Sequence, residues 1–548
     1  MKSTLAIYGI QDINDNGYPE YVHDHSLVYM ENGNIVKMLE LERATRKKHD
    51  NSMHKNLFEL LKSEKLVSSD NYDVVFVDNI LGRSFISANG KIRFEAPLNY
   101  DLKTDIEKGK CWWLDKEIDG YALNHELAHV YSCIPFFGTF KENSLLVHFD
   151  GGASLSNFSA WIWKNNKIEL IEYNWNLKQI SSFYNANALN FFILNVNRNE
   201  HNSLPGKYMG FSSFGVYDRK IENWLSENNF FENIWKNKIT FFESVDKNFG
   251  IKIQNFSTND TFLQNIAATI QQIFTRIVIE KLKNLQISTK TEFLYYTGGS
   301  ALNIITNSEI ISNQIFKNVF IPPCTSDTGL ALGAASYLEM KKGNEIKIHN
   351  PYLNNWNLEA NNIDYSYETI KKVAQLLSEK KVIGVCNGNS EIGPRALGNR
   401  SIISLANCKQ LAKKISQELK KREWYRPLAP IMLEKNTKYF TGLEKIHHLS
   451  KFMLLEFDIL KNKFSEIEGV VHVDGTSRIQ TIFNRNDNEF IFDLLTVLDL
   501  NYNIKALINT SFNRKGEPIV HTMENAVDAA KEMNLDALIY NGKFIEIN

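Results

Sequence analysis

The feature that most constrains the fold is a change of composition beyond the middle of the chain. Residues 341–365 read KKGNEIKIHNPYLNNWNLEANNIDY, a polar, asparagine-rich stretch between segments with regular apolar patterns. Such a stretch is typical of a boundary between folding units, and 548 residues exceed the ~100–200 of a single domain. We therefore expect a first domain over 1–345, a linker over 346–365 and a second domain over 366–548. We find no repeat within the sequence.

Composition and charge indicate a globular chain. Hydrophobic residues make up 43% and charged residues 23%, and 62 Lys and Arg against 63 Asp and Glu leave a net charge of −1. This charge argues against a protein that binds nucleic acid over its whole surface, although a local groove can still be basic. The five cysteines form no CxxC pair, which favours free thiols in a reducing compartment.

The same sequence argues against export and membrane insertion. The first acidic residue, Asp12, comes too early for the apolar core of a signal peptide. No apolar run approaches the roughly 18 residues of a membrane span. We expect a cytoplasmic protein without membrane contact that acts as a monomer or homodimer.

The first domain reads as a mixed α/β unit. Alternating apolar residues on both sides of Asn32-Gly33-Asn34 predict a hairpin. Two later apolar runs, 144–149 and 293–296, end at Asp150-Gly151 and Gly298-Gly299. Glycines at the end of a buried strand let a ligand, commonly a phosphate or nucleotide, approach the backbone. For either pair alone, a tight structural turn is the favoured interpretation.

Helical patterns complete this reading. The apolar spacing over 261–285 predicts a packed amphipathic helix. The small residues of 330–340 predict a helix packed closely on a sheet, with Asp327 near its N-cap position. In the second domain we expect a helix over 366–380 and a strand over 381–386, again mixed α/β.

His125 and His129 form the first candidate site. Two histidines at i, i+4 project from one helical face and can share a metal ion. Asp327 is a candidate third ligand, and two imidazoles with one carboxylate suit Fe(II), Mn(II) or Zn(II); a helix cap fits Asp327 equally well. The string 125–129 also matches the HExxH of zinc proteases. The extended ligand pattern is missing downstream, and a protease would leave the second domain unexplained.

The second domain carries cations beside turns. Arginines follow a Gly-Pro turn in 391–401, and more cations lie in 420–427 and 472–478. Residues 509–513, NTSFN, add hydroxyl and amide donors after an apolar strand. These cations stand next to Gly, Pro and aromatic residues rather than along a periodic charged face. They predict a pocket for a compact phosphate anion.

Taken together, these motifs resemble the nodulation-protein-U-type O-carbamoyltransferases, a family that includes antibiotic-tailoring carbamoyltransferases. The matching strings follow the family's order over almost the whole chain. They are HDHSLVYMENGNIV and ELERATRKKHD (within 23–50), NHELAHVYSCIPFF (124–137), DGGAS (150–154), TGGSALN (297–303), PPCTSDTGLALGAA (322–335), EIGPRALGNRS (391–401), KKREWYRPLAPIML (420–433), HVDGTSRIQTI (472–482) and NTSFNRKGEPIV (509–520).

The resemblance implies an N-terminal domain of the actin/hexokinase-like ATPase type, similar to the tRNA threonylcarbamoyl-transfer domain. It implies a C-terminal YrdC-like domain that forms carbamoyl adenylate and pyrophosphate from carbamoyl phosphate and ATP, with Mg(II) accompanying the ATP. An acceptor hydroxyl then attacks the carbonyl of the adenylate at a metal site in the N-terminal domain.

Residue roles are implied by position in the family's motifs. His23 and Lys48 match the catalytic positions of the transfer site, where a base or a carbonyl-polarising group is required. The implied metal ligands are His125, His129 and Asp327, with Fe(II) favoured over Mn(II) or Zn(II). The implied nucleotide contacts are Asp150, Gly151, Gly298, Gly299, Asn303 and Arg395. The implied carbamoyl phosphate contacts are Lys420, Arg426, Arg478 and Ser511.

Two positions depart from the family's pattern. Glu126 stands where the family has a second adjacent histidine, and we expect the pair at i, i+4 to bind metal without it. Asn387-Gly388-Asn389 lacks a basic residue often present there, which puts one phosphate contact in doubt.

The sequence alone does not identify the acceptor. We expect a hydroxyl-bearing small molecule, a natural product or a sugar, contacted by loops within 154–255. Carbamoylation of a hydroxymethylated DNA base or another nucleic acid is the alternative, and a basic groove leading to His129 would favour it. A non-enzymatic nucleotide-binding protein is a third class, which the retention of both the metal and the phosphate residues disfavours.

Overall fold

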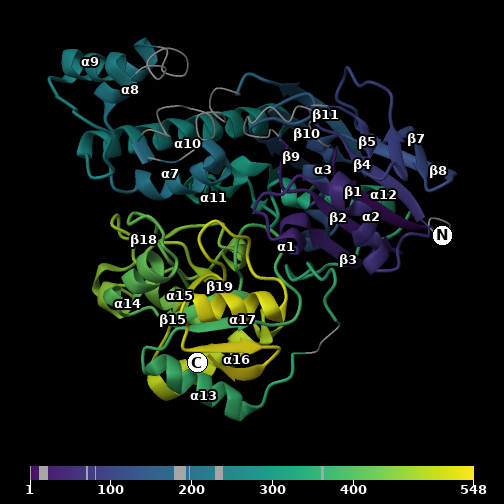
Figure 1. The fold of residues 1–548 in the computed structure, drawn as a ribbon. Coiled ribbons are helices and arrows are strands. Elements are labelled where there is room, and N and C mark those ends of the chain that lie inside the picture. Colours follow the sequence, from purple (N-terminus) through teal and green to yellow (C-terminus); the bar gives the residue numbers. More distant parts are fainter. Residues whose placement is uncertain are drawn as a thin grey trace.

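The computed structural model describes residues 2–10, 22–68, 72–80, 82–177, 193–194, 196, 198–228, 238–359 and 363–547. The predicted mixed α/β class is confirmed. In Figure 1 the N-terminal half (purple to teal) lies above the C-terminal half (green to yellow). The described strands of the two large N-terminal sheets all precede residue 321, and those of the largest C-terminal sheet all follow residue 382. The division at 346–365 stays a prediction.

The N-terminal half contains one strand order twice. In the first sheet the order is β3 (Asn34–Glu40), β2 (Ser26–Glu31), β1 (Ser3–Tyr8), β4 (Tyr72–Val77) and β8 (Lys116–Leu123), extended by β7 (Glu107–Trp113), β6 (Ile92–Glu95) and β5 (Ser84–Ile86). In the second it is β11 (Lys167–Asn174), β10 (Phe158–Lys164), β9 (Ser144–Phe149), β12 (Phe293–Thr297) and β13 (Asn318–Phe320).

Each sheet begins with an antiparallel meander and continues with parallel strands. The first strand of each meander, β1 or β9, pairs in parallel with β4 or β12. This duplicated arrangement is the one expected for the actin/hexokinase-like class. The duplication lies in the topology and not in the sequence, where we find no repeat. The predicted hairpin around Gly33 is confirmed as β2 and β3.

Helices cover and separate these sheets. Those of the N-terminal half are α1 (Leu41–Thr45), α2 (Met53–Ser63), α3 (His125–Tyr131), α4 (Ile134–Phe137), α7 (Leu204–Ser212), α8 (Arg219–Glu227), α9 (Lys238–Phe249), α10 (Thr261–Thr289), α11 (Ile304–Ser312) and α12 (Leu330–Lys341). The expected amphipathic helix is α10, which buries its Ile266, Ile270 and Leu282 face. None of the described helices combines the length and apolar character that a membrane crossing requires.

The close crossing of α3 and α12 shapes the centre of this half. Both helices contribute to one apolar core together with residues of the two sheets, including Ala6 of β1 and Leu146 of β9. A methyl group on Gly333 would lie 1.7 Å from the carbonyl oxygen of Ala128. Only glycine fits there, so the backbones touch. This contact brings the segment that precedes α12 close to the side chains of α3.

The C-terminal half is built around a seven-stranded sheet. Its order is β19 (Gln480–Ile482), β16 (Ala429–Leu433), β20 (Leu507–Ser511), β15 (Arg400–Leu405), β14 (Ile383–Cys386), β21 (Ala537–Tyr540) and β22 (Lys543–Glu546). A two-stranded ribbon joins β17 (Phe457–Asp458) and β18 (Thr476–Ser477). The helices are α13 (Tyr367–Ser378), α14 (Lys409–Lys413), α15 (Glu434–Thr441), α16 (Glu489–Tyr502) and α17 (Met523–Glu532). The helix expected over 366–380 is α13, with Ser366 as its N-cap.

Much of the expected linker is docked onto the N-terminal half, and its end is docked onto the C-terminal half, where the N–H of Asp364 donates to Asn541 O at 3.1 Å. The backbone N–H of Lys347 donates to Gly33 O at 3.0 Å, and that of His349 donates to Pro135 O at 2.7 Å. The buried ring of Trp356 donates from Nε1 to Leu60 O at 3.2 Å. The hydrogen bonds of Lys347, His349 and Trp356 attach the segment to the surface of the N-terminal half.

Candidate active site

The two histidines at i, i+4 and the aspartate of the sequence analysis meet in the structure. His125 and His129 lie on one face of α3, and their Nε2 atoms are 3.0 Å apart. Asp327 Oδ1 lies 3.6 Å from His125 Nε2 and 3.5 Å from His129 Nε2. The alternative of a capping role for Asp327 is wrong, because Gly329 is the N-cap residue of α12 and Ser326 is that of the short helix Asp327–Gly329.

The donor set fits a divalent metal ion. Ligands of a tetrahedral ion at ~2.0–2.2 Å stand about 3.3–3.6 Å from one another, close to the separations of these atoms. Asp150 Oδ2 lies 3.5 Å from His129 Nε2 and adds a fourth donor, the second oxygen of the set. The Tyr8 hydroxyl donates to Asp327 Oδ2 at 2.9 Å, which leaves Oδ1 directed at the histidines.

Electrostatics tie the same groups together. Burial alone lowers the pKa of His125, but the nearby Asp327 carboxylate outweighs it, so the pKa is raised. Burial alone raises the pKa of Asp327, but His125 and His23 hold it well below its usual range. A buried carboxylate that faces imidazoles can bind a dication, which then takes the place of the protons that these groups share.

Glu126 takes no part in this donor set. It is fully buried, and its Oε1 accepts hydrogen bonds from the backbone N–H groups of Leu155 and Ser156 at 2.7 and 3.0 Å. It fixes the loop after Asp150 instead of facing a metal ion. A protease mechanism that needs this carboxylate as a base is therefore excluded, and the departure from the family's second histidine has a structural role.

His23 belongs to a bridged trio on the cavity wall. Its Nδ1 lies 2.9 Å from Asp24 Oδ2, and His49 Nδ1 lies 2.9 Å from Asp24 Oδ1. Burial alone would lower the pKa of His23, but the Asp327 charge and the Asp24 hydrogen bond raise it to about 10. Asp24 and His49 both have positive φ angles, 57° and 55°, a backbone state often found at functional sites.

Lys48, the other expected transfer residue, lies near this trio on the same cavity wall. Burial lowers the pKa of its ammonium group, although the negative charge of Glu42 acts in the opposite direction.

The two glycine-ended strands predicted from the sequence lie side by side in the structure. β9 and β12 pair in parallel, so Asp150 and Gly298-Gly299 emerge at the same edge. The N–H of Gly299 donates to Asp150 Oδ2 at 2.5 Å. Asn303 caps α11 and exchanges hydrogen bonds with Gln271 of α10. The structure thus links the predicted nucleotide turn directly to the candidate metal ligands.

The predicted anion pocket is a cluster of cations. Lys420, at the end of a π-helical segment Lys414–Leu419, donates to the Ser511 and Asn513 carbonyl groups. Arg422 donates to Ser511 Oγ at 3.1 Å. Burial and the neighbouring cations Arg422 and Arg426 hold the pKa of Lys420 well below its usual value. Cations that depress one another's pKa form a site prepared for an anion.

Arginines 395 and 478 complete the cluster. Burial and Arg426 lower the pKa of Arg395 to about 10, and burial with Arg395 and Arg422 lowers that of Arg478 well below its usual value. The Nε atoms of both arginines are buried and make no hydrogen bond within the described chain. Unpaired buried donors of this kind are available to a bound phosphate.

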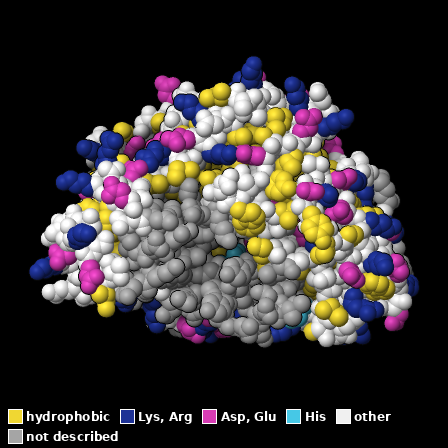
Figure 2. Space-filling view, turned by 90° about the horizontal axis from the view of Figure 1, so that it is seen from above, with side chains coloured by type: hydrophobic (Ala, Val, Ile, Leu, Met, Phe, Trp, Pro, Cys, Tyr) yellow, Lys and Arg dark blue, Asp and Glu magenta, His cyan; other side chains and the backbone are white. Residues whose placement is uncertain are grey.

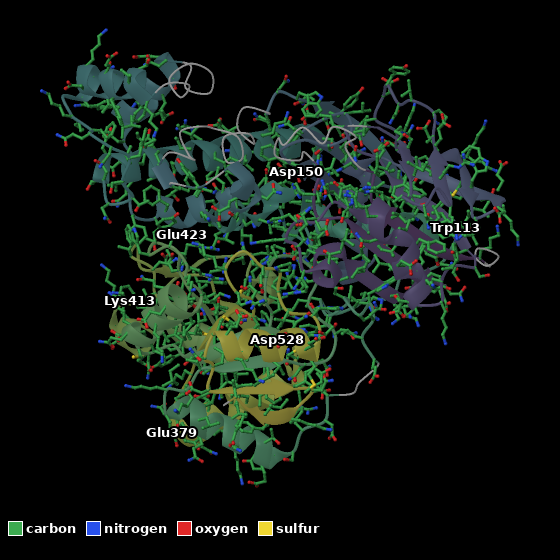
Figure 3. The ribbon with its side chains drawn as sticks, in the orientation of Figure 1. Trp113, Asp150, Glu379, Lys413, Glu423 and Asp528 are labelled. Atoms are coloured by element: carbon green, nitrogen blue, oxygen red, sulfur yellow. The ribbon has the colours of Figure 1, made fainter. Side chains whose placement is uncertain are left out.

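One cavity of about 1260 Å³ joins the two sites. Its walls include His23, Asp150, Asp327 and Gly299 from the N-terminal half, and Arg395, Lys420, Arg426, Arg478 and Ser511 from the C-terminal half. Figure 3 shows Asp150 and Glu423 on the facing sides of the two halves. Asn389 lies elsewhere, on a separate smaller cavity beside Asn399.

Sequence reasoning missed several groups at these sites. His148 of β9 stacks on His129, with ring centroids 5.1 Å apart, and Asp150 was expected only as a nucleotide contact. Arg422 was not separated from its neighbours. Asp24 and His49 were not singled out either. The roles of these residues depend on contacts within the folded protein. The one signal in the local sequence was that His148 lies close to Asp150, where the strand ends at glycines.

Comparison with known proteins identifies the kind of enzyme to which this cavity belongs. Residues 103–336 match the family model described as Carbamoyltransferase N-terminus, and residues 374–546 match Carbamoyltransferase C-terminus. The pair of models in this order defines a two-domain carbamoyl-transferring enzyme. The chain belongs to the carbamoyltransferase family.

Relatives extend over most of the chain. Nodulation protein NolNO of Sinorhizobium fredii is 24% identical over 98% of this chain and 81% of that protein. Nodulation protein U of Azorhizobium caulinodans is 24% identical over 90% of this chain and 92% of its own length. An uncharacterised protein of Methanocaldococcus jannaschii is 28% identical, covering 77% of this chain and 82% of its own.

Similar solved structures are more distant. Full-length HypF in its phosphate- and nucleotide-bound form matches 63% of this chain and 56% of its own, with 12% identity and a TM-score of 0.31. Component A of (R)-2-hydroxyglutaryl-CoA dehydratase from Acidaminococcus fermentans matches 63% of this chain and all of its own, with 12% identity and a TM-score of 0.35. No functional conclusion follows from likenesses this remote.

Proposed function

We propose that the protein is an ATP-dependent O-carbamoyltransferase that makes carbamoyl adenylate in its C-terminal, YrdC-like half and uses it in its N-terminal half. The observation that carries the proposal is one cavity lined by the cation cluster on one side and by Asp150 and Asp327 on the other. Asp327 Oδ1 lies 3.6 and 3.5 Å from the Nε2 atoms of His125 and His129, so an intermediate made at the cations can move within this cavity to the donor set.

The donor-making reaction uses the cations. Water releases the phosphate of carbamoyl phosphate, leaving carbamate, whose oxygen attacks the α-phosphorus of ATP. Pyrophosphate leaves, and carbamoyl adenylate remains. Lys420, Arg426, Arg478 and Ser511 hold the small dianion, and Arg395 faces the ATP phosphates, because charge on phosphoryl oxygens is stabilised by fixed cationic donors. Mg(II) accompanies the ATP.

The transfer reaction uses the N-terminal half. The acceptor hydroxyl attacks the carbamoyl carbon, and AMP leaves with the hydroxyl proton on its phosphate. His23, whose pKa is raised to about 10 beside Asp327 and Asp24, is protonated and donates from Nε2 to the carbamoyl carbonyl oxygen, while Asp24 occupies its Nδ1. Lys48 faces the same space and stabilises the developing negative charge. Gly298, Gly299 and Asn303 shape the turn that receives the nucleotide.

A divalent ion held by His125, His129 and Asp327, with Asp150 beside them, would supply Lewis-acid polarisation of a bound oxygen. Fe(II) is our favoured ion, and Mn(II) and Zn(II) suit the same donors. Tyr8 and the crossing of α3 with α12 keep these donors together.

The acceptor is a small hydroxyl-bearing molecule in this proposal. Most of the cations that line the cavity come from the C-terminal half, where the phosphates of the co-substrates need them. Among the described residues of the face in Figure 2, basic and acidic side chains are interspersed.

Pyrophosphate release and transfer can be measured separately. With ATP and carbamoyl phosphate the protein should release pyrophosphate. His129→Ala should abolish transfer of labelled carbamoyl to an acceptor while sparing this release, and Arg478→Ala should abolish both. Unchanged pyrophosphate release by Arg478→Ala would show that the division of labour is wrong. Labelling of hydroxymethylated DNA in place of small acceptors would replace the proposed acceptor class.

A further inference from the structure

A lysine of the N-terminal half reaches into the cation cluster of the C-terminal half. Lys207 lies on α7 with 3% of its surface exposed. Its Nζ lies 2.9 Å from Glu423 Oε1 and 3.5 Å from Glu200 Oε1. Glu423 Oε2 in turn lies 3.6 Å from an NH group of Arg426. The Glu423 carboxylate therefore stands between one cation from each half.

The loop that carries Glu423 rests on the same helix. Trp424 Nε1 donates to Thr258 Oγ1 at 2.9 Å, and the Trp424 ring packs edge-on against Phe214 at 4.8 Å between centroids. Tyr425 packs against Phe211 of α7 at 5.3 Å. Figure 1 shows α7 on the side of the N-terminal half that faces the other half. The anion-binding loop is thus positioned by α7 as well as by its own sheet.

A buried ammonium group needs a reason, because its desolvation is costly unless it is paired. The sequence motifs assign Lys207 to neither reaction. Its effect falls on Glu423, which is the acidic side chain next to Arg426. A carboxylate this near can satisfy the guanidinium of Arg426 and compete with an incoming phosphate.

We propose that Lys207 is a positioning residue for the donor pocket. By pairing with Glu423 it draws that carboxylate away from Arg426, so that Arg426 stays available to carbamoyl phosphate. The acceptor-side helix α7 thereby sets the affinity of the donor site. This inference rests on the proposed function, since it names the anion that Arg426 receives.

The test measures pyrophosphate release at varied carbamoyl phosphate. Lys207→Met should raise the KM for carbamoyl phosphate roughly tenfold, the effect of one charge-assisted contact, with kcat and the KM for ATP changed less than twofold. Adding Glu423→Gln should bring the KM back to within threefold of wild type, because the competing carboxylate is gone. A merely structural loss would be made worse by the second substitution.

A matched control removes an ion pair of similar length away from the cavity. Lys37 on β3 lies 2.8 Å from Glu64, and Lys37→Met should leave all these constants unchanged. An unchanged KM in Lys207→Met, or a double variant no better than the single one, would overturn the proposal.

A second readout separates this inference from the proposed function. Calorimetric titration with inorganic phosphate should show roughly tenfold weaker binding to Lys207→Met than to wild type. If wild type released no pyrophosphate yet showed this difference, the proposed reaction would be wrong and the role of Lys207 supported. If wild type were active and phosphate binding did not change, the inference would be wrong and the function supported.

Discussion

Tyr8 shows how the candidate metal site depends on a side chain that supplies no ligand. It is fully buried on β1, and its hydroxyl holds Asp327 Oδ2. Second-layer hydrogen bonds of this kind fix the orientation of a ligand and its basicity. Asp327 caps no helix, so the orientation of its carboxylate depends on this hydrogen bond.

Tyr8→Phe is therefore expected to weaken metal binding about tenfold with little change in folding, because the ring volume is kept. The measurement is competition with a chelator for Mn(II) or Zn(II). Tyr29→Phe removes a hydroxyl that bonds Glu31 at 2.6 Å on the same sheet and should not change the affinity. Equal metal affinity in Tyr8→Phe and wild type would contradict the assignment of Asp327 as a ligand.

At this scale the sequence predicted what is local. The spacing of His125 and His129 predicted one shared helical face, which the structure confirms. The partners of Arg422 and Lys207 could not be predicted, because Ser511 and Glu423 lie far away in sequence. The pairing of Lys207 with Glu423 depends in addition on the packing of the two halves.

The loop that follows β14 shows how elements hold the two sites in register. Gly393 has a φ of 90°, and its N–H donates to the buried Glu40 Oε1 at 2.5 Å. Arg43 bonds both Glu40 and the carbonyl oxygen of Gly393. A methyl group on Gly393 would lie 2.3 Å from Pro323 O, in the loop that leads to Asp327. The loop carrying Arg395 is thus in direct contact with the loop that leads to the candidate metal ligand Asp327.

Gly393→Ala should lower the melting temperature and reduce carbamoyl transfer, because a positive φ costs about 1–2 kcal/mol for other residues and the clash adds to it. Gly90→Ala is the matched control: its φ is 69° but nothing lies within 4 Å of the added carbon. Differential scanning calorimetry should show a larger loss for Gly393→Ala. Similar losses in the two variants would mean that the contact with Pro323 is unimportant.

Periodicity and glycine placement predicted β9, β12, α10 and α12 among other elements. The doubled sheet order followed only from the family resemblance, since the two sheets share their topology while their side chains differ. The docking of 344–358 on the N-terminal half was also missed, because polar composition alone does not distinguish a flexible linker from a segment that packs on a surface.

Across the whole molecule, acidic groups meet where the halves touch. Glu456 exchanges backbone hydrogen bonds with Ser308 Oγ at 3.0 and 3.1 Å. Burial, with the charges of Asp474, Asp458 and Glu309, raises the pKa of Glu456 to about 8. The folded protein therefore keeps a proton that the unfolded chain releases above its ordinary pKa of 4.5.

Stability should accordingly fall as the pH rises from about 4.5 to about 8, since the folded state binds more protons in that range. Glu456→Gln removes this cost, so its advantage in melting temperature over wild type should be larger at pH 8 than at pH 5. The exposed Glu169→Gln should show no such trend. An advantage for Glu456→Gln that is the same at both pH values would contradict the raised pKa.

The seating of the Trp424–Tyr425 loop on α7 has a consequence for protein engineering. A chimera that joins the C-terminal half of one family member to the N-terminal half of another would separate the loop from the helix that supports it. Exchange of acceptor specificity by domain swapping should then succeed only when α7 and the 420–427 loop are transplanted as a matched pair.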